Sequence, residues 1–366
     1  MKSIFLFLSI FFCNSFLFAQ DLTTPPDGGN KKAVVGERIG ITDVTIHYDR
    51  PAVKGREGKI WNGLVHTGFM DLGFGSSKNA PWRAGANENT TITFSTNVYI
   101  DQQPLSAGTY ALFAAMGEGT ATLIFSKNST SWGSFFYDPK EDALRVNVKT
   151  LPLSNSVERL KYEFMDETDT SAVVALQWEK LKIPFTVSVD FAKQQLESFR
   201  NELRSSKGFK SEAWVQAAQF AADHNDLNDA DTWSDFAING KFIGETNFRT
   251  LTTRAMILQK KGDLKGADQL YKEALSMATM IELHQYGRKL ITEKKYAEAL
   301  EVFKMNATKN PGQFTTYAGL MRGYAAIGDN KNALKNALLA LPLAPDKLNK
   351  DSLEVMIGKL KSGKGI

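Results

Sequence analysis

Three regularly spaced alanines constrain the C-terminal half of this 366-residue chain more than any other feature. Ala267, Ala299 and Ala333 follow one another at intervals of 32 and 34 residues, within the similar stretches GDLKGADQLYKEAL, KKYAEALEVFKMNA and GDNKNALKNALLAL. Gly287 lies twelve residues before Ala299, and Pro311 lies twelve residues after it. A period of ~34 residues is typical of stacked helical hairpins, which bury a continuous core only when neighbours pack together.

This pattern resembles the tetratricopeptide repeat. The resemblance implies two antiparallel helices per repeat, small residues where the helices cross, and proline where the second helix ends. A weaker unit begins at Trp214 and includes Ala230. We therefore expect tetratricopeptide-like repeats over residues 211–366, after an amphipathic linker helix at 192–210.

The resemblance also implies that the first helices of the repeats line a concave face, which would capture a protein or a peptide. We predict that Arg249, His284, Arg288 and Arg322 lie on this face. Arg288 and Arg322 are 34 residues apart, which is one repeat. Such a basic groove would favour an acidic segment or a C-terminal carboxylate. The alternative is that these side chains are solvated or pack against the first domain.

Residues 33–191 show a different period, because apolar and polar residues alternate. The stretch TDVTIHYDRP places Val44, Ile46 and Tyr48 on one face, and the stretches TTITF, ATLIF, AVVALQW and PFTVSVDF alternate in the same way. Short alternating strands separated by turn residues predict an antiparallel β-sandwich or barrel. The expected fold class is therefore multidomain: an N-terminal all-β domain followed by an array of helical hairpins.

Four stretches of the all-β domain carry a second resemblance: HYDRPAVKGR, WRAGANENTTITF, LSAGTYALF and SWGSFFYDPKEDALRV. Together they are similar to a secreted bacterial family of the Bacteroidetes type, known as domain of unknown function 2911. The segment TGFMDLGFGSSKNAP is longer and richer in Gly and Ser than the family pattern. The resemblance implies an extracytoplasmic β-domain and no particular activity.

The first residues predict a targeting segment. Lys2 precedes the apolar run IFLFLSIFFC, and Ala19 offers a small residue for cleavage before Gln20. We interpret residues 1–19 as a signal peptide and residues 20–32 as a mobile segment, with no membrane-spanning helix in the mature chain. The protein is then exported, to the periplasm, the envelope or the medium. Cleavage also removes Cys13, the only cysteine.

Known catalytic and metal-binding patterns do not occur in the sequence. The four histidines do not lie at metal-ligand spacing, and there is no HExxH, P-loop or GxSxG motif. We therefore expect no catalytic residues, no metal and no cofactor, and favour a non-enzymatic protein. The net charge of +4 is small for this length and argues against nucleic-acid binding.

A polar cluster in the all-β domain supports an alternative function. The candidate ligand-binding residues are Arg50, Arg56, Trp82, Arg83, Asn87 and Glu88. Aromatic stacking and branched polar side chains could bind a glycan or another small ligand, and could accompany hydrolysis. The competing interpretation is architectural: Arg83 and Glu88 form a buried ion pair that ties a loop to the sheet.

Overall fold

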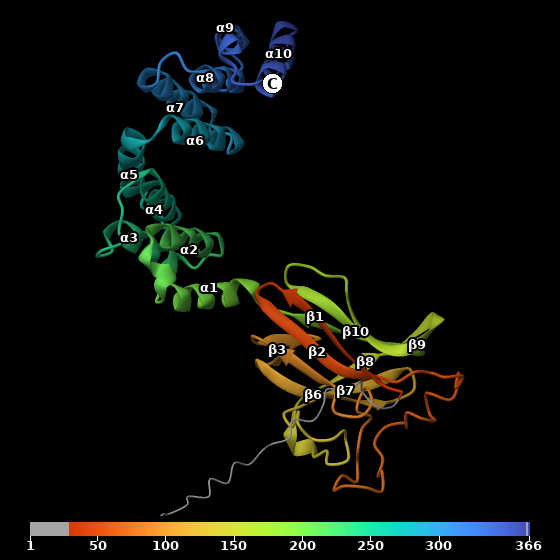
Figure 1. Ribbon diagram of the computed structural model, residues 1–366. Coiled ribbons are helices and arrows are strands. Elements are labelled where there is room, and N and C mark those ends of the chain that lie inside the picture. Colours follow the sequence, from red (N-terminus) through yellow and green to blue (C-terminus); the bar gives the residue numbers. More distant parts are fainter. Residues whose placement is uncertain (1–28, 364) are drawn as a thin grey trace, which may run out of the picture. The chain divides into compact units, whose positions relative to one another are not determined.

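The computed structural model describes residues 29–363 and 365–366, so the predicted signal peptide and most of the predicted mobile segment lie outside the described residues. The chain divides after Gln194 into two compact units, called here the β-unit and the helical unit. Figure 1 shows strands in the first and helices in the second. The division falls inside helix α1 (Phe191–Glu202), within the segment predicted as a linker helix.

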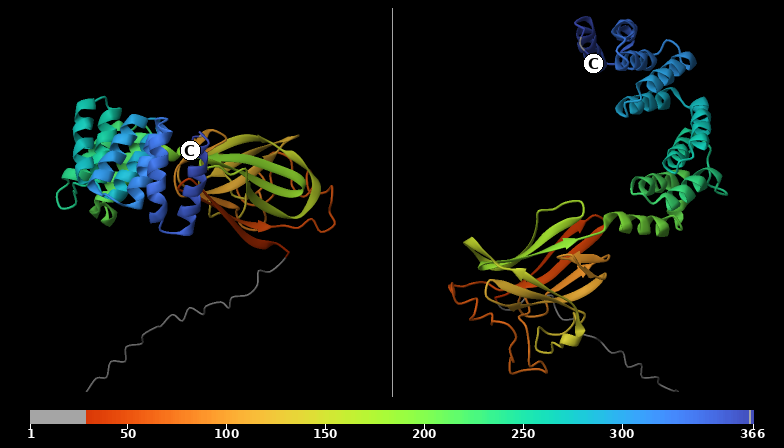
Figure 2. Two further views of the ribbon diagram at one scale, coloured as in Figure 1. Left: turned by 90° about the horizontal axis from the view of Figure 1, so that it is seen from above. Right: turned by 180° about the vertical axis from the view of Figure 1, so that it is seen from behind.

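The β-unit contains two antiparallel sheets that share one core, as expected for a sandwich (Figures 1 and 2). The larger sheet has the order β1-β2-β3-β6-β7-β8, and the smaller has the order β5-β4-β10-β9. The strands are β1 (Lys31–Ile39), β2 (Thr42–Arg50), β3 (Thr91–Phe94), β4 (Val98–Ile100), β5 (Gln103–Leu105), β6 (Gly108–Met116), β7 (Thr120–Ser126), β8 (Asp142–Lys149), β9 (Leu151–Met165) and β10 (Ser171–Ser188).

The alternating pattern determines which side chains enter the core. Val44, Ile46 and Tyr48 of β2 are buried, whereas His47 between them is exposed. In the other sheet, β10 places Trp178 in the same core, where it is 1% exposed. Alternation places every second side chain on the inner face of a strand, so the predicted sandwich is confirmed.

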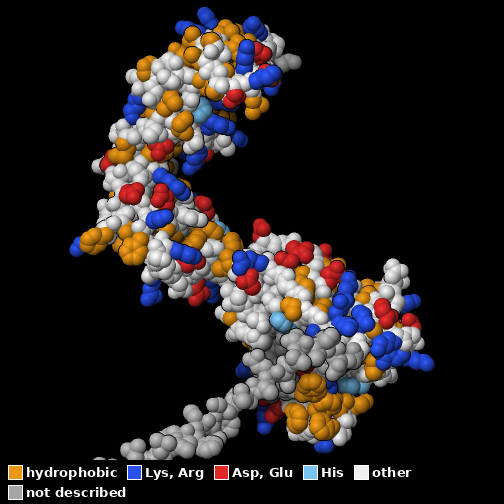
Figure 3. Space-filling model, in the orientation of Figure 1, with side chains coloured by type: hydrophobic (Ala, Val, Ile, Leu, Met, Phe, Trp, Pro, Cys, Tyr) orange, Lys and Arg blue, Asp and Glu red, His pale blue; other side chains and the backbone are white. Residues whose placement is uncertain are grey.

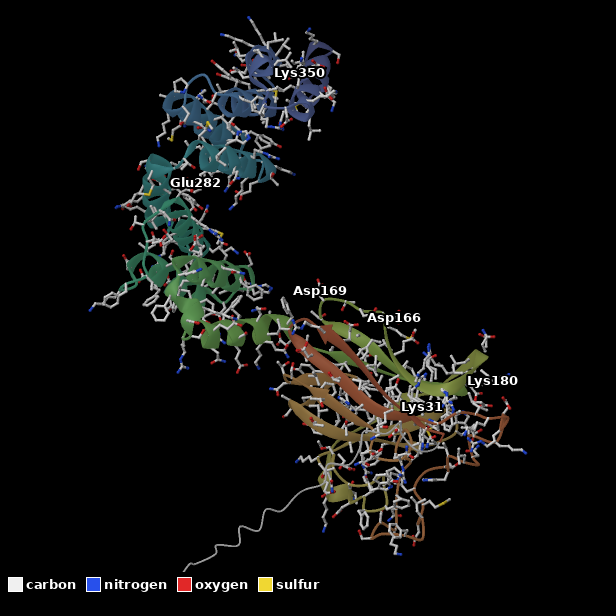
Figure 4. All side chains as sticks on the ribbon, viewed as in Figure 1. Lys31, Asp166, Asp169, Lys180, Glu282 and Lys350 are labelled. Atoms are coloured by element: carbon white, nitrogen blue, oxygen red, sulfur yellow. The ribbon has the colours of Figure 1, made fainter. Side chains whose placement is uncertain are left out.

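Several strands differ from the sequence-based expectation. The stretch AVVALQW and the first five residues of PFTVSVDF belong to one long strand, β10, whose pairing with β9 shifts register near Trp178. The predicted strand ended at Phe191, but β10 ends at Ser188 and Phe191 begins α1. Residues 166–170 connect β9 to β10 and include Asp166 and Asp169, and Lys180 lies where the pairing is irregular (Figure 4). The sheet also begins two residues earlier than predicted, because Lys31 already pairs with Arg50.

The connection from β2 to β3 is long and meets β6 of the larger sheet at several points, the first at Gly68, whose amide donates to the carbonyl of Met116 at 2.7 Å. Trp82 exchanges two backbone hydrogen bonds with Ala114 of β6, at 3.0 and 2.8 Å. The amide of Leu112 in the same strand donates to the carbonyl of Thr90 at 2.8 Å. Residues 83–89 therefore project as a loop from a path that is held on both sides by β6. We call them the 83–89 loop.

The helical unit contains paired helices, which Figure 2 shows stacked one pair after another. The pairs are α2 (Ser211–Asp223) with α3 (Leu227–Asn239), α4 (Phe248–Lys260) with α5 (Leu264–Met277), α6 (Met280–Thr292) with α7 (Tyr296–Lys309), and α8 (Phe314–Ala326) with α9 (Asn330–Ala340), followed by α10 (Lys347–Lys361). Ala230, Ala267, Ala299 and Ala333 are at most 3% exposed and occupy the second helix of each pair. The predicted tetratricopeptide-like array, including its weak first unit, is confirmed.

One aromatic ring joins two successive pairs. Phe303 of α7 is fully buried, and its ring lies against Gly287 of α6 and against Gly319 and Gly323 of α8. A Cβ atom added at Gly287 would lie 2.5 Å from the ring, and one added at Gly319 would lie 2.6 Å from it. The backbones of both helices therefore approach Phe303 too closely for any side chain.

Candidate functional site

Three of the four residues predicted for the concave face come together in one cavity. His284 and Arg288 of α6 and Arg322 of α8 line a cavity of about 310 Å³, with residues of α10 on its other side. The spacing of one repeat between the two arginines places them on equivalent faces of successive first helices. Among the described residues that line this cavity, none is a carboxylate. We call it the arginine pocket.

The charges in the arginine pocket repel one another. Burial lowers the pKa of Arg322, and the neighbouring Arg288 lowers it further. Burial lowers the pKa of His284 to about 4, and the two arginines act in the same direction. His284 is therefore neutral at pH 7 beside two cations. A bound anion would relieve this repulsion.

Arg249 does not belong to this group. Its side chain is exposed on α4, and it does not line the arginine pocket. A larger cavity of about 880 Å³ lies instead among α4, α5, α6 and α7. Its lining is mainly apolar and includes Leu264, Tyr271 and Met305. Sequence reasoning missed this cavity, because it depends on how far successive helix pairs separate.

The β-unit has a cavity of about 380 Å³ beside the 83–89 loop. Four of the predicted ligand-binding residues line it: Arg56, Trp82, Arg83 and Asn87. His66 and Trp178 also contribute to the lining. We call it the tryptophan cavity, since Trp82 and Trp178 stack with ring centroids 6.2 Å apart and Trp61 meets both rings edge-on.

Arg83 is held in the tryptophan cavity without a carboxylate. Its Nη1 donates to the backbone carbonyl of Asn87 at 2.5 Å, and its guanidinium carbon lies 4.8 Å from the centre of the Phe135 ring. The group also lies directly against Gly133, where an added Cβ atom would be 2.2 Å from it. Among the described residues no ion pair of Arg83 with Glu88 is formed. The architectural pairing predicted from the sequence is therefore wrong.

Glu88 turns to the edge of the sheet instead. Its carboxylate accepts a hydrogen bond from Lys32 Nζ of β1 at 2.8 Å, and both side chains are well exposed. Burial and the adjacent Glu88 raise the pKa of Asp49 to about 6, whereas Lys32 and Asp49 lower the pKa of Glu88. Glu88 thus belongs to a carboxyl pair behind the loop and does not line the cavity.

The conformation of the 83–89 loop explains why the two charges separate. Ala84 and Asn87 have φ angles of 45° and 56°, which side-chain-bearing residues rarely adopt. The carbonyl of Ala84 accepts hydrogen bonds from Tyr162 Oη at 2.8 Å and from Thr90 Oγ1 at 3.2 Å. These contacts fix the loop with Arg83 on one side and Glu88 on the other.

The other two arginines of the predicted cluster have structural partners. Arg50 Nε donates to the carbonyl of Leu160 at 2.9 Å and joins β2 to β9. Arg56 donates to the carbonyls of Val53 and Ala52 at 2.9 and 2.6 Å. Sequence reasoning missed His66, Gly133 and Trp178 as members of the site. They come from distant segments, and the only signal was the strand pattern that predicted Trp178 as a core residue.

Two further findings concern other classes of site. Within the part of the chain that the structure describes, no group of three or more His, Cys, Asp or Glu side chains is placed to hold a metal ion. Among the same residues no helix is long and apolar enough to cross a bilayer.

The chain is similar to several solved repeat proteins. One is the C-terminal part of a TPR repeat-containing protein from Cytophaga hutchinsonii, with 16% identity, 47% of this chain and 67% of that chain covered, and a TM-score of 0.33. Another is PilF of Pseudomonas aeruginosa, with 18% identity, coverage of 42% and 68%, and a TM-score of 0.29. A third is YrrB, described as a TPR protein with an unusual peptide-binding site, with 17% identity, coverage of 45% and 84%, and a TM-score of 0.28.

A search of the curated proteins gave no match. The N-terminal part of the chain does match a family model, described as "Protein of unknown function (DUF2911)", over residues 30–187. This range runs from β1 into β10 and so covers both sheets of the sandwich. It confirms the resemblance drawn from the sequence: the β-unit is a domain of the DUF2911 family, and tetratricopeptide-like repeats follow it.

Proposed function

We propose that this protein is an exported, non-enzymatic interaction protein of the cell envelope, and that its helical unit binds an acidic protein segment or a C-terminal carboxylate. The observation that carries the proposal is the arginine pocket. Arg288 and Arg322 enter one cavity from successive first helices, and among its described lining residues there is no acidic partner. A carboxylate would provide the missing counter-charge.

The chemistry of the arginine pocket favours an extended anionic group over a metal or a substrate undergoing reaction. Guanidinium groups bind carboxylates through paired hydrogen bonds, which gives both affinity and orientation. Arg322 is half-buried and Arg288 is exposed, so a bound anion gains most from Arg322, whose charge has lost part of its hydration. His284 adds a neutral ring that can accept a proton when the anion is present.

The surroundings of the arginine pocket suit a peptide. The pocket is also lined by Ile281, Phe314 and Met356, which offer apolar contacts for the side chains that flank a carboxylate. Aromatic residues, methionine and arginine are the residue types enriched at interfaces between proteins. Export rests on residues 1–19 alone, whose apolar run and small cleavage residue are typical of a signal peptide.

The test uses one synthetic peptide in two forms. An acidic peptide with a free C-terminal carboxylate and the same peptide with a C-terminal amide are titrated into the full chain by calorimetry. We expect Arg288→Ala with Arg322→Ala to weaken binding at least about tenfold. A loss shared by both peptide forms indicates recognition of acidic side chains, and a loss confined to the free form indicates recognition of the terminus.

Arg249→Ala is the matched control, because this arginine lies on a first helix but outside the arginine pocket. It should leave affinity unchanged. The melting temperature of the double variant should not fall below that of the parent protein, since the removed charges repel each other. Unchanged affinity in the double variant would refute the proposed function.

A further inference from the structure

The tryptophan cavity of the β-unit gathers buried nitrogen atoms that have no hydrogen-bond partner among the described residues. Trp178 Nε1 and His66 Nδ1 are buried, and neither has a hydrogen-bond partner among the described residues. Trp61 Nε1, beside both stacked indoles, is in the same situation. Buried N–H groups are almost always paired in folded proteins, so several unpaired groups around one cavity point to a partner from outside the chain.

The lining of the tryptophan cavity is positively charged, which favours a ligand with negative charge. The guanidinium of Arg83 donates to one carbonyl and has further N–H groups to offer. The described residues that line the cavity include Arg56 and Arg83 but no carboxylate. A ligand with a negative charge and acceptor atoms fits the two arginines and the unpaired indole N–H group of Trp178.

Residues of two loops hold the guanidinium of Arg83 in place. Gly133 has a φ of 59° and no side chain, which lets its backbone lie against the guanidinium, while Phe135 provides an aromatic face. The hydrogen bond from Arg83 depends on the carbonyl of Asn87, whose own φ angle of 56° lies in the left-handed region. Asn87 therefore adopts a backbone conformation that is uncommon for a residue with a side chain, and Gly133 adopts one that glycine readily allows, on either side of one cation.

We propose that the tryptophan cavity binds a small organic anion, with its carboxylate on Arg83 and its apolar body against Trp82 and Trp178. The volume of about 380 Å³ lies within the range of small-molecule sites, which combine apolar walls with a few polar groups. This site is separate from the arginine pocket of the helical unit. It adds a small-molecule ligand to a chain whose repeats are proposed to bind protein.

The probes are phenylacetate and its neutral amide, phenylacetamide, which have nearly the same shape. Phenylacetate could also enter the arginine pocket, so the titrations use the full chain carrying Arg288→Ala and Arg322→Ala. We expect phenylacetate to bind at least about tenfold more tightly than phenylacetamide. Arg83→Gln should abolish this preference, whereas Arg38→Gln should keep it, because Arg38 is exposed and pairs with Asp43 at 2.7 Å.

A second measurement needs no change at Arg83. The chain is labelled with 15N at its tryptophans, and the indole N–H resonance of Trp178 should shift when phenylacetate is added. Trp214 of the helical unit, whose indole Nε1 donates to the carbonyl of Gly208 at 2.8 Å, serves as the internal reference and should not shift. Equal affinity for the two probes, or a phenylacetate preference that survives Arg83→Gln, overturns the proposal. So does a Trp178 resonance that does not respond at saturating phenylacetate.

Discussion

The contact between Phe303 and its three neighbouring glycines allows a quantitative prediction. Replacing Gly287 with alanine would place a methyl group 2.5 Å from the Phe303 ring. The ring has little room to retreat, because Gly319 also lies against Cδ1 and Cε1 and Gly323 lies against Cδ2, at distances that already exclude a Cβ. One of the helices must therefore move, and repeats that share this ring should lose stability.

The magnitude follows from two opposing effects. Alanine in place of glycine in a helix interior gains about 1 kcal/mol from backbone entropy and helix propensity. Overpacking a filled core costs about 1–3 kcal/mol. Gly358 of α10 is exposed, with nothing within 4 Å of an added Cβ, so Gly358→Ala obtains the gain alone. The two variants should differ by about 1–3 kcal/mol, with Gly287→Ala the less stable.

Urea unfolding of the full chain, followed by circular dichroism at the helical band, measures the difference. Phe303→Leu supplies a further check, because a smaller side chain leaves space for the methyl group. In that background Gly287→Ala should cost less than in the parent, which is a coupling between neighbouring sites. Equal stability of Gly287→Ala and Gly358→Ala, in the presence of Phe303, would refute the packing argument.

Three other predictions concern titration and processing. A carboxylate bound in the arginine pocket should raise the pKa of His284 above about 4, so affinity for the acidic peptide should rise as pH falls from 7 to 5. Calorimetry of His284→Gln, which should lack this rise, tests the prediction. The folded state holds a proton on Asp49 up to about pH 6, so this group stabilises the fold at low pH. Its contribution is lost as pH rises from about 4 to about 6, and the urea midpoints of Asp49→Asn should lack that part of the pH dependence. Exported protein should begin at Gln20, and N-terminal sequencing that finds Met1 would contradict the predicted signal peptide.

The sequence predicted the strands whose side chains alternate regularly and the helix pairs whose buried residues recur at a constant spacing. Strands β2 and β3 alternate cleanly, and the buried alanines of the repeats recur at one hairpin length, so both were expected. Strand β9 was not expected, because most of its side chains are exposed or half-buried and its sequence is largely polar. One strand was divided into two because a register shift near Trp178 interrupts the alternation of β10.

Candidate site residues could be predicted only where they recur with the repeat of the helix pairs. Arg288 and Arg322 repeat with the hairpins, so their shared cavity followed from spacing. Arg83 and Glu88 are close in sequence, but proximity did not reveal the direction in which each side chain leaves the loop. Positive φ angles at Ala84 and Asn87 set those directions, and the partner of Glu88 lies 56 residues away in β1.

The loops around the tryptophan cavity expose many large apolar side chains. Phe69 and Phe74 in the β2–β3 connection and Trp132 and Phe136 in the β7–β8 connection are between 39% and 63% exposed. Figure 3 shows hydrophobic side chains gathered at that end of the β-unit. Extended apolar surface of this kind binds water poorly and favours self-association.

The first strand, β1, carries charged side chains that disfavour pairing of its exposed edge with a strand from another molecule. It forms an outer edge of the larger sheet, and its backbone groups on that side are unpaired within the sheet. Lys31 (labelled in Figure 4), Lys32, Glu37 and Arg38 place charges along it. Charged side chains make an edge strand a poor template for a strand from another molecule. Lys32, which pairs with Glu88, thus also disfavours pairing of β1 with a strand from another copy of the protein.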